Sequence, residues 1–233
     1  MQLTIASRLA DVQARLEHAA LLADRDPTDV TLIAVSKTQP SFPLSEAISA
    51  GVLHLGENRV QEAASKKPEV RGNARWHLIG PLQRNKVKLA LEVFDVIHTL
   101  DRPALANRLQ ILLNEHWPGR RLPVLLEVNV GHEGQKAGVL PDEAEDLARG
   151  VLGNCPSLRL DGLMAIPPFG LDPEASRPHF RALADLQKDL CQRLGIALPS
   201  LSMGMSHDFE VAVEEGATMV RVGTAIFGER RRR

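Results

Sequence analysis

Short apolar runs rich in β-branched residues alternate along this chain with longer segments whose apolar residues recur at helical spacing. Alternation of this kind is typical of α/β proteins with a parallel sheet. An open doubly wound sheet and a closed barrel both fit it, because periodicity does not reveal closure. The eight runs, each followed by a helix or turn, favour a single (β/α)8 TIM barrel, which 233 residues can accommodate. The predicted strands are Thr31–Ser36, Val52–Leu55, Trp76–Ile79, Val96–Thr99, Val124–Val130, Arg159–Ala165, Ser200–Ser202 and Thr218–Val222.

The two ends of the chain differ from this alternating pattern. Apolar residues at the start recur at spacings of three and four, which predicts one amphipathic helix within residues 1–26, ahead of the first strand. Residues 229–233 form an Arg-rich tail, for which we expect a solvated charge run. No linker or short-period repeat separates the strands and helices between them. We therefore expect residues 1–233 to form a single domain, a barrel with an extra N-terminal helix.

Composition argues against several classes of function. The formal net charge is −1 and aromatic residues make up 3% of the chain, so it lacks the basic field and the stacking platforms of nucleic-acid-binding proteins. No apolar stretch is long enough for a membrane span. Cys155 and Cys191 lie far apart, and no histidine or cysteine spacing fits a metal site. The sequence predicts a soluble cytoplasmic protein with reduced thiols and without nucleic acid, membrane or metal partners.

Lys37 is the first candidate for chemistry. In α/β barrels the active site lies at the carboxyl ends of the strands, and Lys37 directly follows the first predicted strand. Desolvation there lowers the pKa of an amine, and a neutral amine can attack a carbonyl to form a Schiff base. The alternative is a surface lysine whose ammonium stays in water.

The loops after the seventh and eighth predicted strands change the balance between these readings. Barrels often bind phosphate in these two loops, and Ser206, Gly223 and Thr224 lie in them. Glycine lets the backbone approach a phosphate, and the two hydroxyls can donate to its oxygens. Ser206 alone fits a helix cap equally well. An amine together with a phosphate cradle predicts a phosphorylated aldehyde or ketone as ligand.

Five ordered segments of the chain resemble the pyridoxal phosphate homeostasis protein family: Ala34–Thr38, Gly56–Glu62, Trp76–Lys86, Met203–Ser206 and Val220–Gly228. The resemblance implies a fold-type III barrel related to the N-terminal domain of alanine racemase. It also implies pyridoxal 5′-phosphate (PLP) held as an aldimine on Lys37. By the same resemblance, Ser206, Gly223 and Thr224 contact the phosphate, and Arg221 is the partner of the pyridine nitrogen.

Other positions near the predicted site are open to two readings. Asn58, after the second strand, either contacts the ring face or hydroxyl of the cofactor or caps a helix. Arg59 stands where many relatives carry an aromatic residue, and His207 stands where a small or acidic residue is commoner. The glycine-rich loop Gly131–Gly138 predicts a mobile lid, in which Lys136 is either a second amine or a plain surface lysine.

Arg221 bears on whether such a site would turn over a substrate. A guanidinium beside the pyridine nitrogen disfavours its protonation, and an unprotonated ring is a weaker electron sink. The alternative is an ion pair of Arg221 with Asp208 or Glu210 inside the barrel. The racemases that the chain resembles use a tyrosine from a second domain, whereas this sequence contains no tyrosine and leaves no room for that domain after the eighth strand. His77 and His207 are the other bases considered.

These observations predict a PLP-binding protein of vitamin B6 homeostasis with little or no catalytic turnover. The resemblance implies that such a protein buffers PLP and releases it to apo PLP-dependent enzymes, and we expect a monomer. Two alternatives stay open at this point. One is a PLP-dependent amino-acid racemase or decarboxylase of fold type III, and the other is a Schiff-base aldolase acting on a sugar phosphate.

Overall fold

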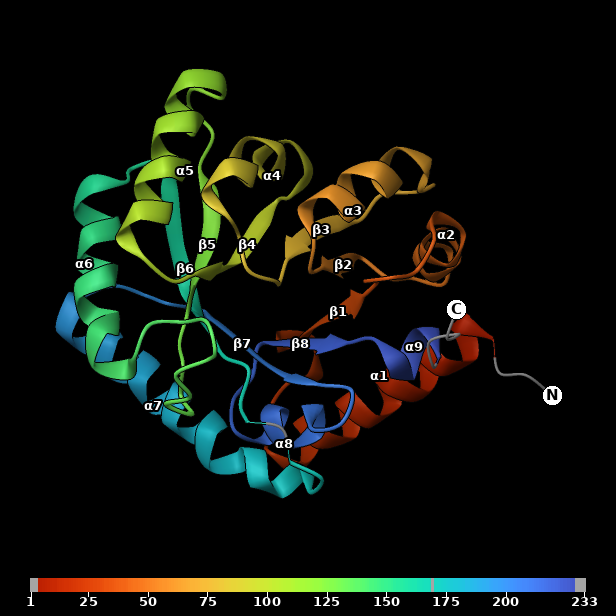
Figure 1. Ribbon diagram of the computed structural model, residues 1–233. Helices are drawn as coiled ribbons and strands as arrows, with labels where there is room; N and C mark the ends of the chain where they lie inside the picture. Colours follow the sequence, from red (N-terminus) through yellow and green to blue (C-terminus); the bar gives the residue numbers. More distant parts are fainter. Residues whose placement is uncertain (1–3, 169, 229–233) are drawn as a thin grey trace.

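The strands close into a barrel. The computed structural model describes residues 4–168 and 170–228, and the strands within them follow one another around the ring in chain order (Figure 1). Neighbouring strands are parallel, and the last strand pairs with the first: Thr31 of β1 lies opposite Met219 of β8, and Ala34 lies opposite Val222. This pairing closes the sheet, which excludes the open doubly wound sheet and confirms the predicted (β/α)8 barrel. The strands are β1 (Thr31–Val35), β2 (His54–Glu57), β3 (Arg75–Leu78), β4 (Val96–Leu100), β5 (Leu122–Glu127), β6 (Leu158–Met164), β7 (Ser200–Met205) and β8 (Met219–Val222).

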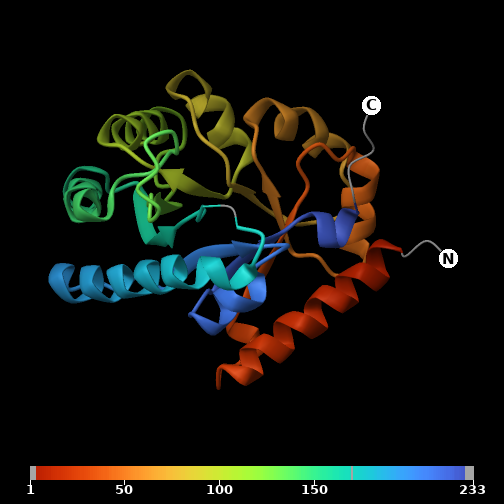
Figure 2. The ribbon, with the colours of Figure 1, turned by 60° about the horizontal axis from the view of Figure 1, so that its bottom comes forward.

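Helices cover the outside of the ring (Figure 2). Proline lies in the first turn of α5 and of α7, where its missing N–H removes no helical hydrogen bond. Gly195 ends α7 in the left-handed conformation, with φ of 65°. The helices are α1 (Ile5–Leu22), α2 (Ser41–Ser49), α3 (Val60–Lys66), α4 (Val87–Val93), α5 (Pro103–His116), α6 (Ala144–Asn154), α7 (Arg177–Leu194), α8 (Phe209–Glu214) and α9 (Thr224–Phe227).

Helix α1 is the predicted extra N-terminal helix, and it packs outside the barrel beside α8 and α9 (Figure 2). Its Arg15 side chain forms an ion pair with Glu210 of α8 at 2.5 Å. The face that α1 turns to the core consists of Leu9, Val12, Leu16, Ala19 and Ala20. Leu9, Val12, Leu16 and Ala20 are among the residues whose helical spacing predicts the helix, whereas Ile5, the first of them, is only partly buried. The predicted Arg-rich tail, residues 229–233, lies outside the described residues.

All eight strands differ from the sequence prediction at one end or both, most of them by one residue, and β2, β5 and β7 differ most. β2 begins and ends two residues later than predicted and includes Gly56, which the periodicity excludes from the strand. A Cβ atom on Gly56 would lie 2.9 Å from Cγ2 of Ile33, so this part of the barrel interior has room only for glycine. β7 continues to Met205 through Gly204, whose φ of +85° favours glycine. The shift of β2 and the extension of β7 carry both strands further toward the carboxyl end of the barrel, whereas β5 ends at Glu127, three residues before the predicted Val130.

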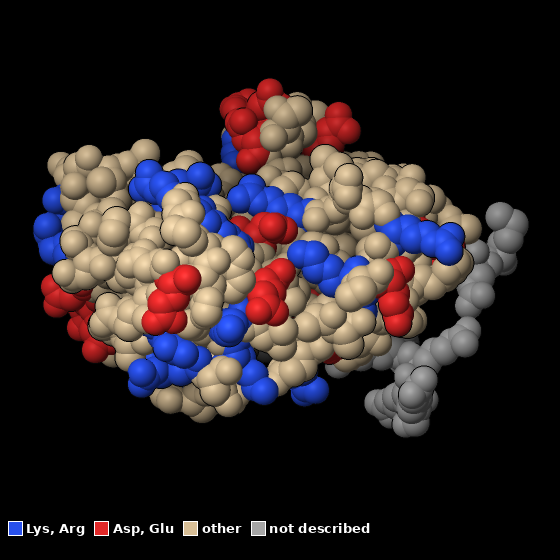
Figure 3. Space-filling view, turned by 90° about the horizontal axis from the view of Figure 1, so that it is seen from above, with Lys and Arg blue, Asp and Glu red and all other residues tan. Residues whose placement is uncertain are grey.

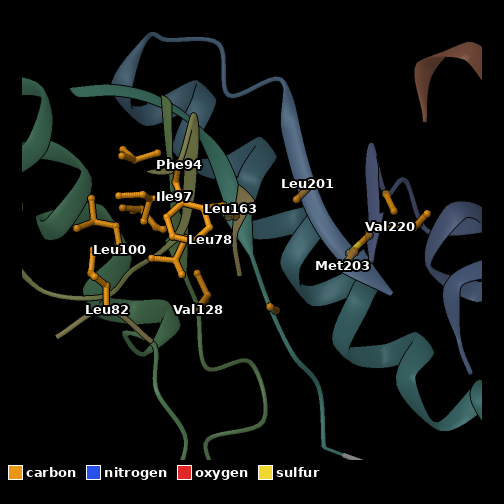
Figure 4. Packing of buried hydrophobic residues seen from close by; sticks show 14 of the residues in the cluster. Leu78, Leu82, Phe94, Ile97, Leu100, Val128, Leu163, Leu201, Met203 and Val220 are labelled. Atoms are coloured by element: carbon orange, nitrogen blue, oxygen red, sulfur yellow. The ribbon is translucent and has the colours of Figure 1, made fainter. Parts of the chain in front are cut away.

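The hydrophobic core has two parts. The larger cluster fills the space between the strands and the helices, and Figure 4 shows members of it from β3, β4, β6, β7 and β8. The smaller cluster consists of Val96, Leu125 and Met164. Because side chains alternate along a strand, His98 and Glu127 share the faces of Val96 and Leu125. Those faces point to the inside of the barrel, which is therefore partly polar.

The surface carries charges of both signs. Seen from above in Figure 3, lysine and arginine side chains are interspersed with aspartate and glutamate, and neither sign forms a continuous field over this face. None of the helices in residues 4–168 and 170–228 is both long and apolar enough to cross a membrane. The same part of the chain has no group of three or more histidine, cysteine, aspartate or glutamate side chains arranged to hold a metal ion.

Candidate functional site

The turn that carries Lys37 is held on both sides by a partly buried polar cluster. Before it, the Ser36 hydroxyl donates to Oε1 of Glu57 at 2.5 Å, and the Ser36 carbonyl accepts from Nζ of Lys66 at 3.0 Å. After it, the Thr38 N–H donates to Oε1 of Glu62 at 2.5 Å. The backbone of residue 37 therefore has a fixed place at the carboxyl end of β1. Its side chain is partly exposed.

Lys66 ties the two carboxylates of this cluster together. Its Nζ lies 2.8 Å from Oε1 of Glu57 and 2.8 Å from Oε1 of Glu62. Burial raises the pKa of the Glu57 carboxyl, while hydrogen bonds from Lys66 and Ser36 oppose the rise. Thr38 adopts φ of +67°, a strained conformation for a β-branched residue, and the Glu62 contact holds it there.

The ends of β1, β7 and β8 meet at this turn. Ser206, after β7, accepts a hydrogen bond through its Oγ from the Gly223 N–H at 3.0 Å. A Cβ atom on Gly223 would lie 3.2 Å from the carbonyl oxygen of Val35, two residues before Lys37. The structure thus brings Ser206, Gly223 and the Lys37 turn together, and Thr224 begins the short helix α9 that follows. The N–H groups in the first turn of a helix have no acceptor within that helix.

Ser206 is not the cap of the following helix, so that alternative reading is wrong. Helix α8 begins at Phe209, and its N-cap residue is Asp208. The Asp208 carboxylate accepts from the Met205 N–H at 2.7 Å and from the Ser176 hydroxyl at 2.9 Å. Ser206 instead joins the loop after β7 to the loop after β8.

Arg221 lies inside the barrel and is 3% exposed. Its guanidinium donates to the Ser202 hydroxyl at 2.6 Å and to the carbonyl of Ala165 at 2.8 Å. Within the described residues it forms no ion pair. Glu210 pairs with Arg15, and the Asp208 carboxylate accepts from Ser176 and from the Met205 N–H, so the predicted alternative of an ion pair with either carboxylate is wrong. Burial lowers the pKa of Arg221 to about 10, so the side chain keeps its charge at neutral pH.

Asn58 has a buried acceptor without a partner. Its Oδ1 makes no hydrogen bond within the described part of the chain. The N-cap of α3 is Arg59, which makes no side-chain cap hydrogen bond, so the reading of Asn58 as a helix cap is wrong. The Asn58 backbone is also tightly packed, since a Cβ atom on Gly80 would lie 2.4 Å from its carbonyl oxygen. Buried polar atoms are normally satisfied, so this acceptor indicates space for a donor from a ligand or a water molecule.

Other sequence candidates lie at the edge of the site. Arg59 is exposed and lines a cavity of about 330 Å³ with Asn58, Pro81, Gln83 and Lys86. Lys136 contacts Glu133 and donates to the carbonyl of Pro167 at 3.0 Å, which ties the Gly131–Gly138 loop to the loop after β6. His207 is exposed.

Sequence reasoning missed Glu127 at the carboxyl end of β5. It is 7% exposed, and its Oε2 makes no hydrogen bond to any other described residue. Burial, with a contribution from Asp101, raises the pKa of this carboxyl to about 7, although Arg221 opposes the rise. The sequence does carry one signal for Glu127. It is a charged residue within the apolar run Val124–Val130, where the strand pattern predicts buried side chains.

Replacing Glu127 by glutamine is expected to make the protein more stable than the wild type at high pH. A folded-state pKa raised from 4.5 to about 7 means that the wild type loses stability as pH rises through this range. The advantage of Glu127→Gln should therefore grow between pH 5 and 8, toward a limit of about 3 kcal/mol. Urea denaturation across this range measures it, with the exposed Glu17→Gln as control. An advantage independent of pH would contradict the assignment.

Comparison with known proteins gives close matches over the full length. The family model of the alanine racemase N-terminal domain matches residues 9–231. The pyridoxal phosphate homeostasis protein of Aquifex aeolicus is 44% identical over 225 residues, covering 96% of this chain and 97% of that protein. The protein of the same name from Pseudomonas aeruginosa is 44% identical over 230 residues, 97% of this chain and 96% of that one. The structure of PipY from Synechococcus elongatus with PLP bound has a TM-score of 0.82 at 38% identity and covers 97% of this chain and 100% of that chain.

Proposed function

The chain belongs to the family of pyridoxal phosphate homeostasis proteins, and from this premise we propose that it binds PLP at the carboxyl ends of β1, β7 and β8. The observation that carries the proposal is the contact of Ser206 with Gly223 beside the turn that bears Lys37. A phosphorylated aldehyde needs an amine and a polar cradle for its anion, and both elements lie here. The PLP-bound structure of PipY supports the proposal.

The residues present fit such a ligand. The amine of Lys37 would hold the aldehyde carbon, and Ser206 and Thr224 would donate to the phosphate. Gly223, whose N–H donates to Ser206, would let the backbone approach the phosphate. Ser206 can donate its own hydroxyl proton while its oxygen accepts from Gly223. The unpaired Oδ1 of Asn58 would accept from the ring hydroxyl.

Arg221 would face the ring nitrogen and limit the chemistry of the site. PLP, when bound, supplies a reversible aldehyde and an electron-withdrawing ring. The charged guanidinium disfavours a proton on the ring nitrogen, which weakens that withdrawal. The site would therefore bind PLP without efficiently activating an amino acid. The relatives bear the name of homeostasis proteins and lend no support to the racemase, decarboxylase or aldolase alternatives.

His77 does not supply a base for turnover. Burial lowers its pKa to about 3, and its ring nitrogens are hydrogen-bonded to two other histidines inside the barrel. We propose on these grounds a protein that takes up PLP, buffers it and releases it to apo PLP-dependent enzymes, without turnover of its own. We further propose that it acts in the cytoplasm as a monomer.

Loading the purified protein with PLP tests the proposal. We expect one PLP per chain, a visible absorption band that borohydride removes, and reconstitution of an added apo aminotransferase from the loaded protein. Exchange of α-deuterium from a panel of amino acids should stay near the rate given by free PLP at the same concentration. Failure to bind PLP would contradict the binding role. Exchange at the rate of a dedicated racemase would contradict the absence of turnover.

A further inference from the structure

Three histidines, a serine and Arg221 form a continuous hydrogen-bonded chain across the inside of the barrel. Nδ1 of His54 lies 2.9 Å from Nε2 of His77, and Nδ1 of His77 lies 2.8 Å from Nε2 of His98. Nδ1 of His98 then lies 2.9 Å from the Ser202 hydroxyl oxygen, which accepts from Arg221 at 2.6 Å. The chain joins side chains of β2, β3, β4, β7 and β8. We refer to His54, His77 and His98 as the histidine chain.

The histidine chain connects the two ends of the barrel. His54 is the first residue of β2, is partly exposed, and lines a cavity of about 510 Å³ with residues of α1 and the start of β1. His77 and His98 are fully buried. Arg221, at the other end, lies in β8 two residues before Gly223 of the proposed phosphate site. A polar path therefore runs from the amino end of the barrel to the candidate site.

All three rings are neutral at physiological pH. Burial lowers the pKa of His77 to about 3 and that of His98 well below its ordinary value, and the neighbouring cations act in the same direction. Burial and Arg75 also lower the pKa of His54. A neutral imidazole has one N–H donor and one acceptor nitrogen, so each ring can receive one hydrogen bond and pass one on.

Hydrogen-bond accounting fixes the direction of the chain. The Ser202 oxygen accepts from Arg221, and the acceptor for its own proton is Nδ1 of His98. His98 then carries its proton on Nε2 and donates to His77, and His77 donates in the same way to His54. All three rings are Nε2–H tautomers. The reverse direction would leave the buried Ser202 proton without an acceptor in the described part of the chain, which is the costlier arrangement.

We propose that His54, His77 and His98 are positioning residues that orient the Ser202 hydroxyl and thereby hold the Arg221 guanidinium in place toward the ligand. The Ser202 hydroxyl would otherwise rotate about its own bond and present its proton to the guanidinium. With the proton held by His98, the oxygen lone pairs face Arg221. The statement that Arg221 faces the ligand rests on the proposed function. The statement that the histidine chain orients Arg221 does not.

Packing alone does not explain these side chains. The interior positions held by Val96, Leu125 and Met164 are apolar, so the barrel accepts apolar residues on its inner face. Buried imidazoles are costly unless each nitrogen is paired, and here every pair depends on the next. The histidine chain fixes one arrangement of hydrogen-bond donors and acceptors inside the barrel. Apolar side chains at the same positions would fix none.

Nitrogen NMR of the wild-type protein without PLP tests the chain directly. We expect the ¹⁵N signals of His54, His77 and His98 to be those of neutral Nε2–H tautomers, with Nδ1 as acceptor. His77 and His98 should not titrate between pH 5 and 8. Nδ1–H tautomers, or charged rings at pH 7, would overturn the proposal.

Variants of His98 test the effect on the site. His98→Leu removes both hydrogen bonds, whereas His98→Gln keeps one acceptor and one donor. We expect His98→Leu to bind PLP about tenfold more weakly and to shift the visible band, and His98→Gln to restore both toward the wild type. The exposed His18→Leu of α1 serves as control and should bind as the wild type does.

The outcomes separate this proposal from the proposed function. If the wild type binds PLP and His98→Leu binds it with unchanged affinity and spectrum, the positioning role is overturned and PLP binding stands. If the wild type does not bind PLP, the proposed function fails. The histidine tautomers measured by nitrogen NMR then still decide whether the histidine chain forms as described. If His98→Leu does not fold, the spectrum of His98→Gln and the tautomers of the wild type remain decisive.

Discussion

Replacing Lys66 by methionine is expected to lower the free energy of unfolding by about 3–5 kcal/mol at neutral pH. The Lys66 ammonium lies 2.8 Å from Glu57, whose side chain is fully buried, and no methionine sulfur can replace its three donors. The substitution leaves two carboxylates and the Ser36 carbonyl without their shared donor. Urea denaturation measures the loss. The variant should regain part of its stability in acid, because a protonated Glu57 no longer needs a cation.

Two further variants make this prediction specific. Lys88→Met changes an exposed lysine of α4 to the same residue and should alter stability by no more than about 0.5 kcal/mol. Adding Glu57→Gln to Lys66→Met removes the uncompensated buried charge and should recover part of the lost stability. A loss of less than about 1 kcal/mol for Lys66→Met would mean that the cluster does not hold the Lys37 turn as described.

Replacing Lys37 by alanine is expected to abolish covalent capture of PLP, seen as loss of the visible band and of borohydride-stable label. The amine is the nucleophile of the proposed site, and alanine supplies none. The phosphate contacts of Ser206, Gly223 and Thr224 would remain, so weak non-covalent binding should persist and be detectable by equilibrium dialysis.

Lys136→Ala is the matched control for Lys37→Ala. Lys136 is a partly buried lysine of a neighbouring loop, tied to Glu133 and Pro167, and its loss should leave the visible band in place. Thermal unfolding of both variants distinguishes lost capture from lost folding. A full visible band in Lys37→Ala, or its loss in Lys136→Ala alone, would assign the amine to another position.

The order and number of strands follow from the sequence because apolar, β-branched runs identify buried strands independently of closure. Strand ends follow less well, and they matter here because the site is built from them. Residue 56 of β2 is a glycine because Ile33 of β1 occupies the space that a side chain would need. This contact lies between two strands, and no local sequence pattern contains it. Gly204 in β7 likewise has a positive φ, and it lies where the register of β7 with β8 shifts between Ser202 and Met205.

The candidate residues Lys37, Ser206, Gly223 and Thr224 could be singled out from the sequence because each follows a predicted strand. The residues that hold the Lys37 turn in place could not be singled out in this way. Lys66 looks like an ordinary helical lysine, and only the fold shows that it reaches Glu57 from the next element of the chain. Glu62 likewise meets Thr38 across 24 positions of sequence. Such contacts depend on the packing of α3 against the barrel.

The polar interior of the barrel is the feature furthest from prediction. His54, His77 and His98 lie 21 to 23 residues apart, and only parallel pairing of β2, β3 and β4 brings their rings within hydrogen-bond distance. A histidine near a strand end is more often a hydrogen-bonded structural residue than a catalytic one. The hydrogen bonds of His77 to His54 and His98 agree with the structural role, although the sequence does not reveal these partners.

The most direct test of the account is peptide mass analysis of the wild-type protein after PLP loading and borohydride reduction. The account predicts one pyridoxyl group per chain, on the peptide that contains Lys37. Label on Lys66, Lys136 or any other lysine, or no label at all, would contradict it.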